Sequence, residues 1–190
     1  MTAASIIISI LFILSLTAPV ATRSAGLVTA DDKLMQRWLV PLTFGVSQGL
    51  MALAGYYLGK LVSHLFLADF APYLVFAMML VVAVKMFVDS MRVLKGKMLY
   101  TVTKELDFIL LSVMASFNTL LLALTGFCFL PFGALQWFVA AVSVAGFLWS
   151  YFTVRSDFTP GMIKKLSFVE FSASVFMVVI AILYLFTDMI

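Results

Sequence analysis

The sequence predicts an all-α integral membrane protein with six transmembrane helices, arranged as two inverted three-helix repeats. Three observations support this prediction: an apolar composition, six separate apolar runs, and positive charge gathered on one side of them. Of 190 residues, 64% are hydrophobic and 11% are charged, and the mean hydropathy is +1.16. A single soluble core could not bury so much apolar surface, so the solvent around the chain must be lipid.

Six apolar runs are long enough to cross a bilayer, which takes about 20 mainly apolar residues per helix. They cover approximately residues 4–22, 39–66, 71–93, 107–130, 134–154 and 164–187. Little of the chain remains between the runs. We therefore expect a single transmembrane domain over residues 1–190 and no soluble domain.

The first run, 4–22, ends in small residues around Ala18 and Ala21, which look like a signal-peptidase cleavage site. A signal peptide begins with positive charge, however, and no Lys or Arg precedes Arg23. We expect this run to remain attached as a helix with its N-terminus outside. It contains Pro19, the one proline expected inside a helix.

The remaining prolines agree with the predicted helix boundaries. Pro41 and Pro72 fall in the first turns of the second and third runs, where a missing N–H costs little. Pro131 and Pro160 are expected in connections, before the fifth and sixth runs.

Lys and Arg are concentrated in alternate loops, as short cytoplasmic loops require. Ten of them follow the first, third and fifth runs, namely Arg23, Lys33, Arg37, Arg92, Lys95, Lys97, Lys104, Arg155, Lys164 and Lys165. The opposite side has only Lys60. This asymmetry predicts that both termini lie outside, and it explains the net charge of +3 without nucleic-acid binding.

The second run, 39–66, contains two pairs of glycines in small-xxx-small spacing, Gly45 with Gly49 and Gly55 with Gly59. Such pairs let another helix backbone approach closely. The glycines are expected to pack helices of one chain, and the alternative is a homodimer formed through them.

Charged residues inside the runs are candidates for function, because a charge at the bilayer centre costs about 2.5 to 3.5 kcal/mol. Lys85 and Asp89 lie four residues apart in the third run, so they share a helix face. Lys85 could also extend toward the membrane interface. Glu170 has a similar depth in the sixth run, where an ion pair between the third and sixth helices is possible.

The two halves of the chain show short matches at an offset near one hundred residues. Residues 15–18 (Ser-Leu-Thr-Ala) correspond to 116–119 (Ser-Phe-Asn-Thr), and 87–89 (Phe-Val-Asp) to 186–188 (Phe-Thr-Asp). Each half, about 1–95 and 104–190, has three helices, so the second must be inverted relative to the first. Inverted repeats are typical of secondary transporters, which bind substrate near the midplane.

Neutral polar residues also lie in the middle of the predicted spans: Ser15, Thr17, Gln48, Ser116 and Asn118. Ser and Thr can bond to carbonyls of the preceding turn, whereas Asn118 and Gln48 need other partners. Pro19 cannot donate to the Ser15 carbonyl, which leaves that oxygen available to a cation or water.

A family resemblance emerges at these positions. The second run has the pattern Phe44, Gly45, Gln48, Met51, Gly55, Leu58 and Gly59. This is similar to the pattern of the MntP-type manganese efflux pumps of bacteria, small six-helix exporters related to the LysE superfamily. Lys85, Met86 and Asp89 resemble the end of that family's third helix, and Glu170 matches an acidic residue of its sixth. The resemblance covers nearly the whole chain and implies a multi-pass protein of the bacterial inner membrane.

The resemblance also implies a metal site, but two positions depart from it. The family has an aspartate in its first and fourth helices, where this chain has Thr17 and Asn118. It therefore implies Thr17, Asn118, Asp89 and Glu170 as metal ligands. Divalent cations such as Mn²⁺ prefer carboxylate and carbonyl oxygens, so losing two carboxylates should weaken Mn²⁺ binding. The expected pathway is lined by Ser15, Thr17, Gln48, Lys85, Asp89, Ser116, Asn118 and Glu170.

Three functions remain open: a divergent transporter exporting a cation or small solute, a true manganese exporter, and a relative that no longer transports and has a structural or regulatory role. We expect no enzyme, because His64 is the single histidine and no nucleophile motif is present. We expect no permanently bound cofactor; Mn²⁺ would be a transported ion. The chain has no phosphate-binding loop for ATP, so an ion gradient would have to drive transport. The proton gradient is the first candidate.

Overall fold

The computed structural model describes residues 3–25, 27–29, 38–63, 71–96, 100–102, 105–125, 135–155 and 160–188. The helices are α1 (Ala3–Ala25), α2 (Leu39–Ser63), α3 (Ala71–Leu94), α4 (Glu105–Leu124), α5 (Leu135–Arg155) and α6 (Pro160–Asp188). Two short strands, β1 (Leu27–Thr29) and β2 (Tyr100–Val102), complete the described elements. Each of the six helices is long and apolar enough to cross a membrane, which confirms the predicted all-α membrane fold.

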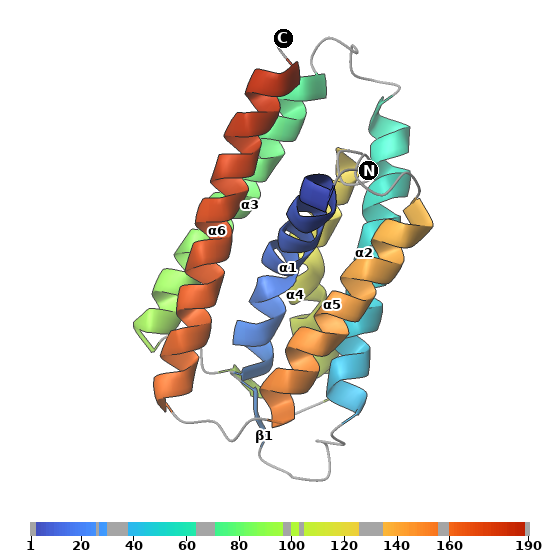
Figure 1. Ribbon diagram of the computed structural model, residues 1–190. Helices are drawn as coiled ribbons and strands as arrows, with labels where there is room; N and C mark the ends of the chain where they lie inside the picture. Colours follow the sequence, from blue (N-terminus) through green and yellow to red (C-terminus); the bar gives the residue numbers. More distant parts are fainter. Residues whose placement is uncertain are drawn as a thin grey trace.

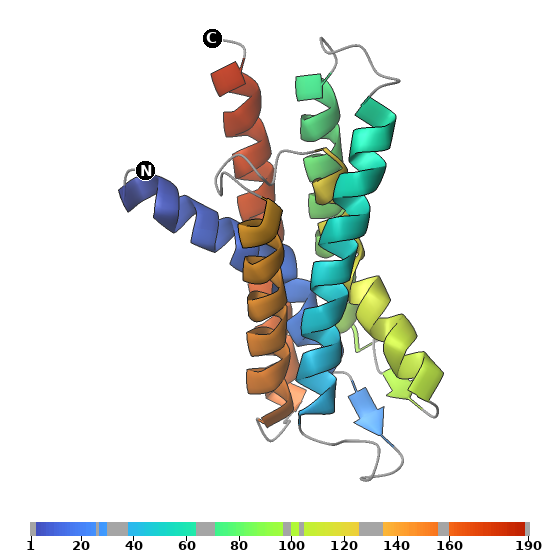
Figure 2. The ribbon, with the colours of Figure 1, turned by 90° about the vertical axis from the view of Figure 1, so that its right-hand side faces the viewer.

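Successive helices run in opposite directions along one bundle (Figure 1). The start of α1 and the end of α6 lie toward the same end, while α1, α3 and α5 all finish toward the other (Figures 1 and 2). Apolar side chains such as Leu61, Trp137 and Phe186 are exposed along the outside of the bundle. In lipid these faces need no protein partner.

The bundle consists of two groups of helices with α1 between them (Figure 1). In one group α3 packs along α6, and in the other α2 packs against both α4 and α5. The central helix α1 contacts α4, α5 and α6 and is the most buried of the six spans. Polar residues in the second half of α1 are therefore held inside the protein.

The glycines of α2 contact other helices of the same chain. A Cβ added at Gly45 would lie 2.9 Å from the carbonyl oxygen of Ser143 on α5, and one at Gly49 would collide with the Ser143 hydroxyl. At Gly55 and Gly59 an added Cβ would collide with backbone oxygens of α4. These contacts support packing of the glycines within one chain.

Two predicted boundaries are wrong. Helix α1 continues to Ala25, so Arg23 lies in its last turns and not in a loop, and only 4% of the residue is exposed. Pro160 is the first residue of α6 rather than part of a connection, a position where a missing N–H breaks no helical bond. The predicted ends of the second and fourth runs, together with Pro131 and His64, lie outside the described residues.

The two strands were not predicted. They pair in parallel, with Leu27 opposite Tyr100 and Thr29 opposite Val102. Because β1 follows α1 and β2 precedes α4, the pair joins these two helices at the end of the bundle where α1 finishes (Figure 2).

Candidate functional site

Four charged side chains gather where α1, α3, α4 and α6 meet inside the bundle. They are Arg23 on α1, Lys85 and Asp89 on α3, and Glu170 on α6, and the exposed fractions of Arg23, Asp89 and Glu170 are 4%, 7% and 1%. Two cations and two carboxylates give this group no net charge when all are ionised. Pairing of this kind is what makes buried charge tolerable.

Arg23 connects three helices. Its Nη2 donates to Oδ2 of Asp89 at 2.9 Å, and its Nη1 donates to the carbonyl oxygen of Met114 on α4 at 2.7 Å. Hydrogen bonds with an ionised partner are stronger than neutral ones. The guanidinium thus fixes α1 against both α3 and α4.

Lys85 points toward α4. Its Nζ donates to Oδ1 of Asn118 at 2.8 Å and lies 3.7 Å from Oδ2 of Asp89. The predicted pairing of Lys85 with Asp89 is therefore present, and the ammonium is held between α3 and α4. A third cation, Arg92, approaches Oδ1 of Asp89 at 4.0 Å, although its side chain is 61% exposed.

The two carboxylate oxygens of Glu170 differ in their hydrogen bonding. Its Oε2 accepts a hydrogen bond of 2.7 Å from the Thr22 hydroxyl, and its buried Oε1 has no partner among the residues that the structure describes. Glu170 still interacts electrostatically with Arg23, Asp89 and Lys85. The ion pair considered between α3 and α6 is replaced by this bond to α1.

The neutral polar residues fall into two kinds. Thr17 and Ser116 bond to carbonyls one turn back in their own helices, at 2.7 and 2.9 Å. Gln48 accepts a hydrogen bond from Thr119 across the contact of α2 and α4. Within the described part of the chain, Nε2 of Gln48 and Nδ2 of Asn118 are buried without partners.

Ser15 lines an open groove of about 490 Å³ between α1, α5 and α6, together with Leu11, Trp149 and Phe176. The Trp149 indole donates to the Leu14 carbonyl at 3.3 Å beside it. Ser15 thus borders this groove, and the described hydrogen bonds and ion pairs connect it to none of the other predicted pathway residues.

The four expected metal ligands are engaged separately in this conformation. Thr17 donates a hydrogen bond within its own helix. The other three accept hydrogen bonds: Asn118 from Lys85, Asp89 from Arg23, and Glu170 from Thr22. Among the described residues, no three His, Cys, Asp or Glu side chains lie close enough to share a metal ion. The arrangement is an ion-pair network with amide and hydroxyl groups at its edges.

Sequence reasoning missed Arg23, Thr22 and Thr119. Charge balance could have revealed Arg23, because Asp89 and Glu170 lie in the third and sixth runs, where Lys85 is the one cation away from the ends of the runs. A second buried cation was needed, and Arg23 directly follows the first run. Thr22 and Thr119 carry no comparable signal, since their partners come from other helices.

The model of the family named MntP, described as "putative manganese efflux pump", matches residues 32–183. The chain belongs to the MntP family. The matched residues include Gln48, Lys85, Asp89, Asn118 and Glu170, whereas α1 with Thr17, Thr22 and Arg23 precedes them. No curated protein and no solved structure matches the chain.

Proposed function

We propose that this MntP-family protein exports a divalent cation, with manganese as the first candidate, by alternating access. The observation behind the proposal is the group of charges that α1, α3 and α6 place inside the bundle, in a family described as manganese efflux pumps. Buried ionisable residues in transmembrane segments are expensive and typically mark ion pathways. Glu170 contributes a buried carboxylate oxygen, Oε1, that accepts no hydrogen bond from the residues that the structure describes.

Helix contacts support two related halves. Exchanging the halves would convert the α1–α5 contact into α4–α2 and the α1–α6 contact into α4–α3, and all four contacts occur. In transporters with inverted repeats, one half or bundle rocks against the other around a central site. We infer that α1 and α4, which enclose the charged group, change their contacts in this step.

The positive residues at the ends of the helices support a topology in the inner membrane of a bacterium, with both termini on the outer side of that membrane. Lys95, Arg155, Lys164 and Lys165 occupy the end of the bundle where α3 and α5 finish and α6 begins. Arg23 does not add to the positive charge at the surface of this end, because it is buried in an ion pair with Asp89. Export would then carry the ion away from this end, and Lys85, Asp89 and Glu170 are the candidate groups for coupling to a proton gradient.

One observation favours the alternative of a membrane protein that no longer transports. Asp89 lies within 4.0 Å of Arg23, Lys85 and Arg92, and a carboxylate with three cationic neighbours is a poor metal ligand. Such a protein would have a structural or regulatory role in the bilayer. A homodimer is not part of either proposal, since the α2 glycines already contact α4 and α5.

Uptake of radioactive Mn²⁺ into everted membrane vesicles distinguishes these functions. We expect uptake by the natural protein to exceed that of empty membranes, and the combined Thr17→Asp and Asn118→Asp variant to take up more. Uptake by the variant alone would indicate an intact scaffold with another natural substrate. Absence of uptake by both proteins, at normal membrane levels, would contradict the transporter proposal.

A further inference from the structure

We propose that the Lys85 ammonium is a tethered cation in an oxygen-lined position between α3 and α4, and that removing its charge opens this position to a mobile metal cation. The inference deepens the proposed function and rests on it for its biological meaning. Binding alone can be tested without transport.

The surroundings of Lys85 contain the oxygen types that bind hard cations. Its Nζ lies 2.8 Å from the Asn118 amide oxygen and 3.7 Å from a carboxylate oxygen of Asp89. Amide and carboxylate oxygens are the ligands that Mg²⁺, Ca²⁺ and Mn²⁺ select in proteins. The ammonium therefore lies where such an ion would find its ligands.

Charge balance strengthens the case. In the group of Arg23, Lys85, Asp89 and Glu170, the two cations and two carboxylates cancel; without Lys85, Arg23 remains opposite the two carboxylates, which leaves this group with a net charge of minus one. Glu170 also has a buried oxygen without a hydrogen-bond partner in the described part of the chain. A mobile cation would restore the charge balance, and Oε1 of Glu170 is available in the same group as a ligand for it.

Lys85 suits this role better than Arg23. Two hydrogen bonds to Asp89 and Met114 fix the guanidinium, and the Arg23 side chain is 4% exposed. The Lys85 side chain is 29% exposed, and a lysine is a compact charge on a flexible stem. Lys85 can therefore leave its position while Arg23 continues to hold α1, α3 and α4 together.

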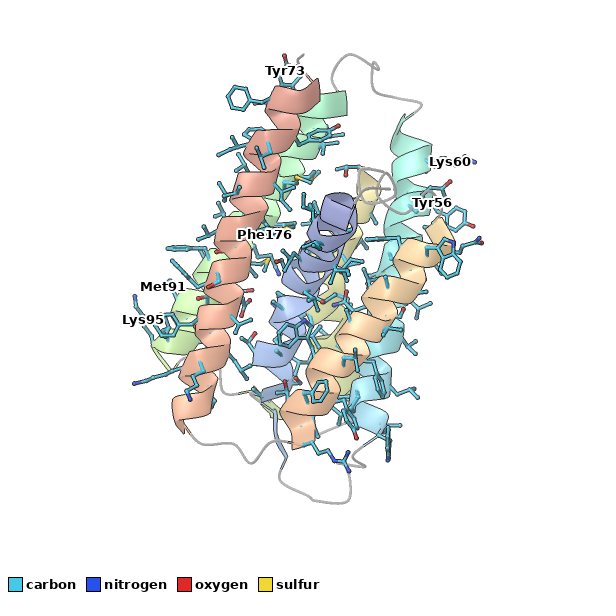
Figure 3. The ribbon with its side chains drawn as sticks, in the orientation of Figure 1. Tyr56, Lys60, Tyr73, Met91, Lys95 and Phe176 are labelled. Carbon is cyan, nitrogen blue, oxygen red and sulfur yellow. The ribbon has the colours of Figure 1, made fainter. Side chains whose placement is uncertain are left out.

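The test compares Mn²⁺ binding by purified full-length proteins in detergent, measured by thermal stabilisation at constant ionic strength. Lys85→Met should bind Mn²⁺ at least tenfold more tightly than the natural protein, and Lys85→Arg, which keeps the charge, should not. Lys95→Met is the matched control, because Lys95 is exposed and lies at the outer side of the bundle (Figure 3). Equal affinity in Lys85→Met and natural protein, or an equal gain in Lys95→Met, would overturn the proposal.

Folding of the neutral variant is itself informative. Lys85→Gln retains a donor for Asn118 without the charge and serves where Lys85→Met fails to fold. Folding of either variant only in the presence of Mn²⁺ would support the proposal. Failure of both even with Mn²⁺ throughout growth and purification would overturn it, because a mobile cation should then replace the ammonium.

The vesicle assay separates this inference from the proposed function. A gain of Mn²⁺ binding in Lys85→Met, without uptake by any protein, would support the tethered cation and contradict transport. Uptake by the natural protein, without a gain of binding in Lys85→Met, would support transport and overturn the tethered cation.

Discussion

At the residue scale, buried charges are paired between helices, and the shortest of these ion pairs joins Arg23 to Asp89. Asp89 was expected to pair with its own helix neighbour Lys85, and it does, at 3.7 Å. The shorter contact, at 2.9 Å, comes from Arg23 on α1. Spacing within one helix predicts the first contact, whereas only packing of α1 against α3 produces the second.

Replacing Arg23 by Met should destabilise the protein by about 3 to 5 kcal/mol, the usual cost of removing one partner of a buried ion pair, because Lys85 and Arg92 lie farther from Asp89, at 3.7 and 4.0 Å. The free energy of unfolding in mixed detergent micelles measures the effect. Adding Asp89→Asn should restore much of the loss, since the buried negative charge is then removed. Arg92→Met is the control and should cost less than about 1 kcal/mol, because Arg92 is largely exposed. Equal losses for Arg23→Met and Arg92→Met would show that the buried pair has no special role.

At the element scale, the helices are held by close contacts of small residues and by polar bonds between helices. The α2 glycines let α4 and α5 approach until backbone oxygens occupy the space of a side chain. Between α3 and α6, the hydroxyl of Ser90 donates to the Ser167 carbonyl at 3.1 Å, and the hydroxyl of Ser167 donates to the Ser90 carbonyl at 2.7 Å. The sequence predicted the glycine contacts but not the serine pair.

Gly55→Val should weaken the α2–α4 contact by about 1 to 3 kcal/mol, as overpacking does. An added Cβ at this position meets the Leu120 carbonyl and, at 2.7 Å, the Cβ of Ala123. The neighbouring Ala54 is exposed on the same helix, so Ala54→Val should leave the thermal midpoint nearly unchanged. A midpoint unaffected by Gly55→Val would contradict the close approach of α2 and α4.

The serine pair should contribute little individually, because interhelical hydrogen bonds in membranes average about 0.6 kcal/mol. A double-mutant cycle of Ser90→Ala and Ser167→Ala, read by unfolding free energy, should give a coupling energy near that value. Strictly additive losses would indicate that the two reciprocal bonds do not form.

At the scale of the whole molecule, β1 and β2 join the helices that enclose the charged group. If α1 and α4 separate at this end during transport, linking the strands should stop it. Val28 lies opposite Thr101. The chain has a single cysteine, Cys128, so Val28→Cys with Thr101→Cys, in a Cys128→Ser background, can be cross-linked by oxidation. We expect Mn²⁺ uptake to fall at least tenfold and to recover on reduction, while the background protein is unaffected. Full uptake by the cross-linked protein would place the opening elsewhere.

The sequence by itself determined the number of spans, their approximate limits and the MntP family, because membrane insertion depends on local runs of apolar residues and the family pattern is also local. It also indicated polar residues inside the spans, among them Lys85, Asp89, Asn118 and Glu170. Only the tertiary structure decided their partners: Arg23 for Asp89, Asn118 for Lys85 and Thr22 for Glu170. Those choices depend on how α1, α3, α4 and α6 approach one another, and spacing along a single helix does not contain that information.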